Sequence, residues 1–450
     1  MTQDEVIHGN WFLPDNEENH FNGQLSFGPN TPIRLSLIAT LKTRLSSFGF
    51  GIGEYTIWGY GVDGQPITLL GCNRLNIGSG LGIDQATFNA HYIIIGKHTR
   101  DHKTKEFNGV TFSVSNLDAW LQHNGFDVIS NSSTEYTVNY KRPSDIPFSI
   151  NETISGNFTT RNNVPINTRE KIELLQANFI ELNFTESVDI EKATKNVYQF
   201  QQLLAILMFE NVSVNEIYLT SENRQIRLFY RQIGGLADND RDLNLVRFPF
   251  IRSFWGDIVS KWFVLCETLA PVINILYANV GESGDFVHNN FLNIVQAVEA
   301  FHRRQIQNTE QLKSNYAKLL SRIVDKIEDE EDCKWLKEKL SFSYEPSLRT
   351  RLKELIALHS AILFAEETKT SDTKQIIKEV VDKRNYYTHY DPSLEKQNED
   401  IATLLRLTQF LKLLLTYCLL NELGMNAAFL SDKVYQRFRI RITKATTRKK

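Results

Sequence analysis

Apolar and polar residues alternate with a period of two along the first part of the chain, which is the pattern of half-buried β-strands. Short runs of this kind lie at 24–27, 33–38, 55–60, 91–96, 109–114, 136–140 and 179–184. Turn-forming glycine, proline, asparagine and aspartate separate many of them, and residues 116–121 predict one helical turn. Strands of this number and spacing predict an antiparallel sandwich or barrel-like layer over residues 1 to about 170.

The pattern becomes mostly helical after Ser187, with one return to alternation at 214–219 and 226–230. A stretch rich in glycine and aspartate at 234–242 is the best candidate for a linker. Beyond about residue 250, apolar stripes with helical spacing lie at 258–269, 291–302, 348–362, 376–381 and 401–424. They predict a bundle of roughly five or six helices.

We therefore predict an α+β protein with several domains. A β-rich antiparallel region covers 1–250, with an optional subdivision near 170–187, and an all-α bundle covers 251–445. Residues 446–450 form a basic tail. A chain of 450 residues is too long for one ordinary core, which supports a division of this kind.

Composition indicates a globular protein, with 42% hydrophobic and 23% charged residues. The most apolar helix, at 401–424, is interrupted by Arg406 and Lys412, so we expect it at the centre of the bundle and not across a membrane. The polar first residues do not resemble a signal peptide, and the four cysteines are widely spaced without a CxxC pair. Both observations favour a reducing cytoplasm.

Net charge is −3, so nothing in the overall balance indicates nucleic acid. The C-terminal end differs, because seven basic residues and no acidic one follow Gln436. Candidate RNA-binding residues here are Arg437, Arg439, Arg441 and Lys444. Such a segment could follow an RNA backbone or simply keep the terminus solvated, and the sequence leaves both readings open.

The stripe at 376–381 continues into polar residues with a chemistry of their own. At helical spacing, Arg384, Asn385 and His389 extend the apolar face, and Pro392 ends the helix nearby. An arginine fork fits a phosphate with two hydrogen bonds, and histidine exchanges protons near neutral pH. Together they suffice for RNA cleavage without a metal, because the histidine moves protons and the arginine stabilises the charged transition state.

The alternative is structural. Arg384 would pair with Asp382 or Glu379, and His389 would cap the C-terminus of the helix. The spacing alone favours this reading. Of the ten histidines, however, only His389 follows an arginine by five to seven residues.

Arg384-Asn385-x-x-x-His389, at a helix end and followed by Asp-Pro, resembles the Arg-x4–6-His signature of HEPN ribonucleases. Five other stretches add to this likeness. Residues 9–15, 21–25 and 35–37 resemble the start of the ApeA N-terminal domain, and 291–304 and 348–355 resemble helices of the ApeA-type HEPN domain. The chain is thus similar to ApeA proteins over both halves, least so at 150–250.

The resemblance implies an anti-phage protein whose HEPN domain cuts host RNA, including tRNA, without metal or other cofactor. It implies that a phage component triggers the β-rich half, and that HEPN domains pair as a homodimer with one shared cleft. Arg384 becomes the phosphate binder, His389 the acid/base and Asn385 an orienting group. Glu299 would hold Arg384 in place, or else pair with Arg303.

Two other expectations concern side chains near or beyond this motif, and a third concerns the function. Tyr386 and Tyr387 could stack on bases, although helix packing suits them better. His98 and His102 have the spacing of a zinc pair, but no third ligand is in view, so we expect no metal. A HEPN module that binds RNA or a partner without cutting remains the alternative function.

Overall fold

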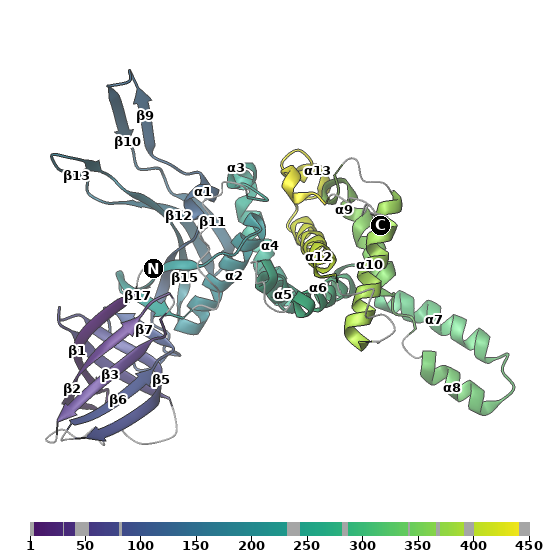
Figure 1. Ribbon diagram of the computed structural model, residues 1–450, viewed down its shortest axis with the longest axis horizontal. Helices are drawn as coiled ribbons and strands as arrows, with labels where there is room; N and C mark the ends of the chain where they lie inside the picture. Colours follow the sequence, from purple (N-terminus) through teal and green to yellow (C-terminus); the bar gives the residue numbers. More distant parts are fainter. Residues whose placement is uncertain are drawn as a thin grey trace, which may run out of the picture. The chain divides into compact units, whose positions relative to one another are not determined.

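The computed structural model describes residues 4–29, 31–40, 54–80, 83–231, 244–280, 287–340, 343–365, 370–390 and 400–440. It divides into two compact units, Met1–Ser260 and Lys261–Lys450. In the described residues the first unit carries all the strands, and the second is helical (Figure 1). The expectation of a β-rich half followed by a helical bundle is confirmed. The expected linker at 234–242 lies outside the described residues.

A closed six-stranded antiparallel barrel forms the start of the first unit. Its strands are β1 (Glu5–Leu13), β2 (Asn16–Phe27), β3 (Arg34–Thr40), β4 (Tyr55–Gly61), β5 (Pro66–Gly80) and β6 (Ile83–Asn89). They pair in the order β1-β2-β3-β6-β5-β4, and β4 pairs with β1 to close the ring. Alternate residues point inward, so Trp11, Leu25 and Ile57 fill the interior completely buried. Of the two architectures expected, this part of the region is therefore the barrel.

The sheet continues from the barrel through β7 (Tyr92–Ile95), which pairs with β5. The further strands follow in the order β17 (Arg224–Tyr230), β16 (Val214–Ser221), β8 (Phe107–Val114), β15 (Gln176–Val188), β12 (Ile154–Asn162) and β11 (Ile146–Asn151). Strand β15 covers most of the optional subdivision at 170–187 and pairs with both β12 and β8. The boundary between the two compact units lies at Ser260/Lys261 and not at 170–187.

Helix α2 (Ile190–Met208) packs on this sheet at β8. The Asp189 carboxylate accepts a hydrogen bond from the Lys192 amide at 2.7 Å and so caps the start of the helix. The short helix α1 (Leu117–Leu121) contacts β15 and the short helix α3 (Phe248–Ile251), which η2 (Arg252–Phe254) follows. An aromatic cluster ties these elements together through Trp120, Phe158, Phe248 and Trp255.

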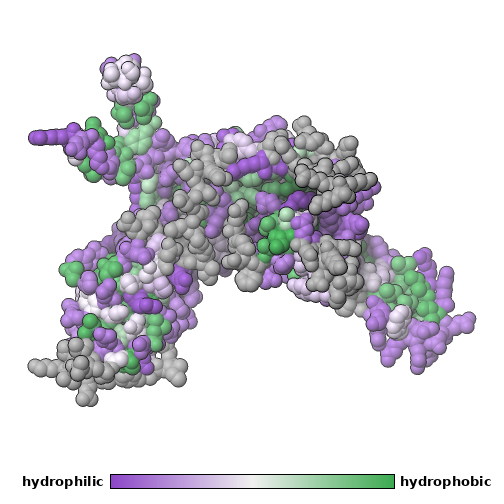
Figure 2. Space-filling view, in the orientation of Figure 1, coloured by the Kyte–Doolittle hydropathy of each residue, from purple (hydrophilic) through white to green (hydrophobic). Residues whose placement is uncertain are grey.

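Two hairpins stand apart from this sheet. They are β9 (Phe126–Ser130) with β10 (Tyr136–Tyr140), and β13 (Ile166–Asn167) with β14 (Ile172–Glu173) (Figure 1). Each is a separate two-stranded sheet, and together they expose Val128, Val138, Val164 and Ile172 to solvent. Figure 2 shows apolar side chains on these hairpins.

The second unit is a bundle around α12 (Ile401–Glu422), which packs against four helices. These are α5 (Ala270–Val280), α6 (Val287–Phe301), α9 (Leu348–Leu363) and α10 (Thr370–His389). Helix α4 (Trp255–Thr268) enters the unit, and α13 (Ala427–Leu430) and η5 (Gln436–Phe438) follow α12. Among the described helices, α12 alone is long and apolar enough to cross a membrane without a second helix. Of its apolar 18-residue stretch, 72% is buried inside the protein. This burial agrees with its expected place at the centre of the bundle.

A helical hairpin interrupts the bundle between α6 and α9. It consists of α7 (Thr309–Val324) and α8 (Glu330–Leu340), and it follows a π-helical turn, η3 (His302–Ile306). Leu319, Ile323 and Trp335 are exposed on it, and α8 buries none of its residues. The periodic stripes in the sequence did not distinguish this hairpin from the bundle. The acidic run at 328–332 includes both the end of the connection and the first residues of α8.

Candidate functional site

The Arg384–His389 motif forms the last turn and a half of α10. The helix ends because Tyr390 adopts the left-handed conformation, with φ of 49°. Its amide still donates to the carbonyl of Tyr386, at 2.6 Å. The C-terminal end of α10 therefore presents the motif from a regular, well-closed helix.

The motif residues separate by burial. Tyr386 and Tyr387 are buried, with ring centroids 4.9 Å apart. Tyr387 also packs on His288 of α6, with ring centroids 4.6 Å apart. Asn385 and His389 are exposed and Arg384 is half-buried, so the polar members of the motif face solvent. The tyrosines thus have the packing role, and their rings do not lie open for base stacking.

Arg384 lies between two groups that accept hydrogen bonds or charge. Its Nη1 donates to Oδ1 of Asn385 at 3.2 Å, and its Nη2 is 3.9 Å from Oε2 of Glu299 on α6. An ion pair this exposed contributes at most about 1 kcal/mol, so it orients the guanidinium without sequestering it. Arg384 keeps enough exposure, with 35% of its side chain accessible, to accept an incoming phosphate.

Two residues that the sequence suggested as alternative partners form ion pairs with other residues. Glu379, a candidate partner of Arg384, makes its ion pair with Arg406. Arg303, the candidate partner of Glu299, pairs with Glu345 at 3.4 Å. The geometry therefore leaves Glu299 beside Arg384.

His389 is the last residue of α10 and carries a solvent-exposed imidazole. Within the described part of the chain it has no hydrogen bond or ion pair, so both ring nitrogens are available to a ligand there. Thr388, its neighbour, donates back to the Arg384 carbonyl at 2.7 Å and stiffens the turn between the two residues. The end of α10 therefore carries an accessible imidazole and a partly exposed guanidinium, the two groups whose chemistry suits a phosphodiester.

A buried cation next to the motif was missed in the sequence analysis. Lys383 is 6% exposed, and its Nζ has no hydrogen-bond partner among the described residues. Burial lowers the pKa of Lys383 below its usual value, and the nearby charges of Asp400 and Glu379 offset this effect only in part. Helical spacing was the signal that could have placed it, because Lys383 follows Ile376 by seven residues and Val380 by three.

The two described candidates near the C-terminus, Arg437 and Arg439, differ in their contacts. Arg439 donates to the backbone carbonyls of Ser431, at 2.6 Å, and Ala361, at 3.4 Å, so it holds the C-terminal segment against α9. Arg437 is exposed, with its guanidinium 4.4 Å from the ring centroid of Phe438. Arg441 and Lys444 lie outside the described residues. Of the four candidates, Arg437 is the described residue whose side chain is exposed.

The histidine pair considered for zinc has other contacts. His98 stacks on Trp58, with centroids 4.8 Å apart, and its Nε2 is 3.0 Å from the Gly59 carbonyl. His102 lies 3.1 Å from Glu191. The described residues contain no cluster of three or more side chains that could hold a metal.

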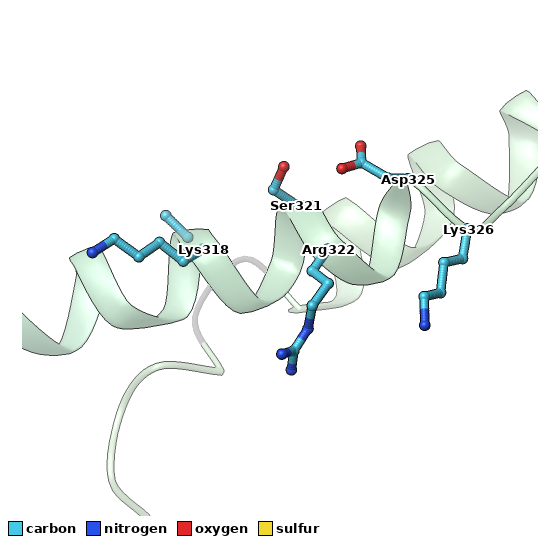
Figure 3. Close-up of a pocket in the computed structure, with 6 residues that line it drawn as sticks. Lys318, Ser321, Arg322, Asp325 and Lys326 are labelled. Atoms are coloured by element: carbon cyan, nitrogen blue, oxygen red, sulfur yellow. The ribbon is translucent and has the colours of Figure 1, made fainter.

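A shallow hollow of about 720 Å³ lies on α7 and not at the motif. Lys318, Ser321, Arg322, Asp325 and Lys326 line it (Figure 3). Figure 3 shows Arg322 and Lys326 extending to one side of the helix, and Ser321 and Asp325 to the other. The hollow is thus a solvated helix surface of mixed charge.

Two family models match the chain. The model described as ApeA N-terminal domain 1 matches residues 6–262, and the model described as Apea-like HEPN matches residues 292–429. The second range contains Glu299 and the whole motif of α10. No curated protein and no solved structure shows significant similarity to the chain.

Proposed function

The chain belongs to the ApeA family of anti-phage proteins, and on this premise we propose that it is a metal-independent endoribonuclease. The observation that carries the proposal is the pairing of Arg384 with Glu299, on the same helix end as the exposed His389 and inside the segment that matches the HEPN model. In the alternative, purely structural reading, the arginine would be engaged by Glu379 or Asp382 and the site would be closed.

In the proposed reaction the ribose 2′-hydroxyl attacks the adjacent phosphorus and the bond to the 5′-oxygen breaks. His389 takes the proton of the 2′-hydroxyl or supplies one to the leaving oxygen. Arg384 donates to the non-bridging oxygens as charge builds on the pentacoordinate phosphorus, and Asn385 and Glu299 orient the guanidinium. The products are a 2′,3′-cyclic phosphate and a 5′-hydroxyl. In this scheme protein side chains move the protons and stabilise the charge, so it requires no metal.

One motif supplies one imidazole, whereas the reaction has two proton transfers. We therefore place two copies of the chain together, so that two motifs share one cleft and the second His389 serves the other oxygen. The exposure of His389 and Asn385 suits such sharing, because both side chains lie at the surface of their own bundle. The proposed substrate is host RNA, with tRNA as the first candidate, in the cytoplasm.

The β-rich unit is proposed as the sensor of infection, which binds a phage component and releases the nuclease. A second candidate function is a HEPN module that grips RNA or a partner without cutting. Its support is the exposure of Arg384, because a guanidinium that can reach a phosphate suits binding as well as turnover.

The test is cleavage of end-labelled tRNA and total RNA by the purified full-length chain, with and without EDTA. We expect cleavage in EDTA with cyclic-phosphate ends, lost in Arg384→Ala and His389→Ala. Arg349→Ala, on the exposed face of α9, is the matched control and should cut like the wild type. Dependence on a divalent metal, or 3′-hydroxyl ends, would contradict the mechanism. RNA binding by all variants without turnover would favour the binding module.

A further inference from the structure

A second cluster of charged side chains lies inside the helical bundle, apart from the motif. Arg351 of α9 is 2% exposed and His302 of η3 is 1% exposed, although neither residue type is ordinarily found fully buried. Gln307, Glu345 and Glu354 complete what we call the Arg351 cluster. A buried guanidinium is stable only when its donors are satisfied, so the arrangement of its partners is informative.

Every nitrogen of the Arg351 guanidinium has an acceptor. Nε donates to the Pro346 carbonyl at 3.0 Å, and Nη2 to Glu345 at 2.5 Å. Nη1 faces Gln307 Oε1 at 2.8 Å, His302 Nδ1 at 3.1 Å and the Glu299 carbonyl at 3.5 Å. Arg351 therefore joins the last turn of α6 to Gln307 and Glu345, which lie at the two ends of the segment that carries α7 and α8.

These contacts determine which ring nitrogen of His302 carries the proton. Arginine has only donors, so Nδ1 of His302 accepts and carries no proton. Nε2 must then carry the proton, which it donates to Oε2 of Glu354 at 2.6 Å. The imidazole is therefore neutral, with one tautomer selected by its two partners.

The backbone beneath the cluster is a π-turn. The Gln307 amide donates to the carbonyl of His302, five residues earlier, at 2.9 Å. A π-turn holds one extra residue, and it places both Phe301 and His302 in the interior. Such turns are costly and are frequent at functional sites. Here the turn brings His302 to Arg351, directly after the turn of α6 that carries Glu299.

Glu299 connects this cluster with the motif. Its carbonyl oxygen faces Arg351 at 3.5 Å, and its carboxylate lies 3.9 Å from Nη2 of Arg384. The same residue thus contacts a buried arginine through its backbone and the motif arginine through its side chain. A change at Arg351 that shifts the end of α6 shifts the carboxylate that orients Arg384.

We propose that Arg351, held by His302 and Glu345, is a positioning residue that sets Glu299 and, through it, the guanidinium of Arg384. This inference rests on the proposed function only for its consequence in catalysis. The consequence is that the base of the α7–α8 hairpin, which Gln307 and Glu345 flank, is linked to the guanidinium of Arg384 through three successive contacts. A ligand on the hairpin could then alter the nuclease through the Arg351 cluster.

The test uses the full-length chain and measures Arg384 itself. Phenylglyoxal modifies accessible guanidinium groups, and mass spectrometry gives the rate at Arg384, with exposed Arg349 as an internal reference. We expect Arg351→Lys to raise the rate at Arg384 by about threefold, as does Glu299→Gln, and the double variant to equal Glu299→Gln. Glu345→Gln, which keeps the size of the side chain, serves if Arg351→Lys fails to fold. Arg303→Ala is the matched control, because Arg303 contacts Glu345 from the surface.

RNA cleavage is measured on the same variants. A loss of rate in Arg351→Lys that does not add to that of Glu299→Gln supports positioning. An unchanged phenylglyoxal rate at Arg384 in both Arg351→Lys and Glu345→Gln overturns the inference. A raised rate in a chain that cuts no RNA supports the coupling and contradicts the nuclease instead.

Discussion

His359 makes the stability of the helical bundle depend on pH in a way that can be calculated. It lies on α9, is 3% exposed, and its Nδ1 has no hydrogen-bond partner among the described residues. Burial lowers the pKa of His359 from 6.5 to about 4. The folded bundle therefore keeps this imidazole neutral at pH values where the unfolded chain protonates it.

The sign follows from proton binding. Between pH 6.5 and 4 the unfolded state binds more protons, so the stability from this group is present above pH 6.5 and is lost as pH falls. From pH 7 to pH 5.5 the loss is about 1.2 kcal/mol, from the folded pKa of about 4 and the unfolded value of 6.5. In His359→Leu this contribution disappears, so the variant should lose about 1.2 kcal/mol less than the wild type over that interval.

Pulse proteolysis in urea at the two pH values, with a peptide of α9 followed by mass spectrometry, reports the bundle separately from the β-rich unit. Other titrating groups are common to both chains and cancel in the difference. His389→Ala, which removes an exposed imidazole of the same bundle, is the control for the loss of a histidine as such. An equal loss for His359→Leu and the wild type would refute the argument, since it would mean that His359 is protonated in the folded bundle.

Three further predictions concern single contacts. Asp189→Ala removes the cap of α2 and should lower the free energy of unfolding by about 1 kcal/mol, measured in urea, and an unchanged midpoint would contradict this. Gly59→Ala places a Cβ 2.4 Å from Cε3 of Trp11 in the barrel and should cost about 1–3 kcal/mol, whereas Gly78→Ala, which meets open space, should cost far less in the same thermal scan. Glu299→Gln should slow RNA cleavage by about two- to fivefold, because it weakens a partly exposed ion pair, and a loss as deep as that of Arg384→Ala would show a direct catalytic role instead.

Local spacing was sufficient to predict the parts of the site that lie on one helix. The stripe of α10 placed the motif at its end, and the stripes of α6 and α9 included His302 and His359 among apolar residues. The same spacing also contained Lys383, but a lysine in a charged stretch looks solvated until the packing of the helix is known. Periodicity therefore locates a residue on a face without showing how deep that face is buried.

Contacts between distant parts of the chain could not be read from the sequence. The closure of the barrel depends on β4 pairing with β1, and two hydrogen bonds join Arg227 to Glu5 across 222 residues. The Arg351 cluster likewise joins α6 to α9 across an inserted hairpin. Patterns of period two or 3.6 carry no information about which elements meet, so only the resemblance to a family indicated that Glu299 belongs near Arg384.

The central claim is that Arg384 and His389 cut RNA when infection is sensed. The most direct measurement is RNA integrity in cells that express the wild type, Arg384→Ala or His389→Ala at equal levels, with and without phage. The account predicts RNA fragments with cyclic-phosphate ends only in infected cells that carry the wild type, together with protection of the culture. Protection by all three proteins with intact RNA would contradict the claim and leave binding as the mechanism.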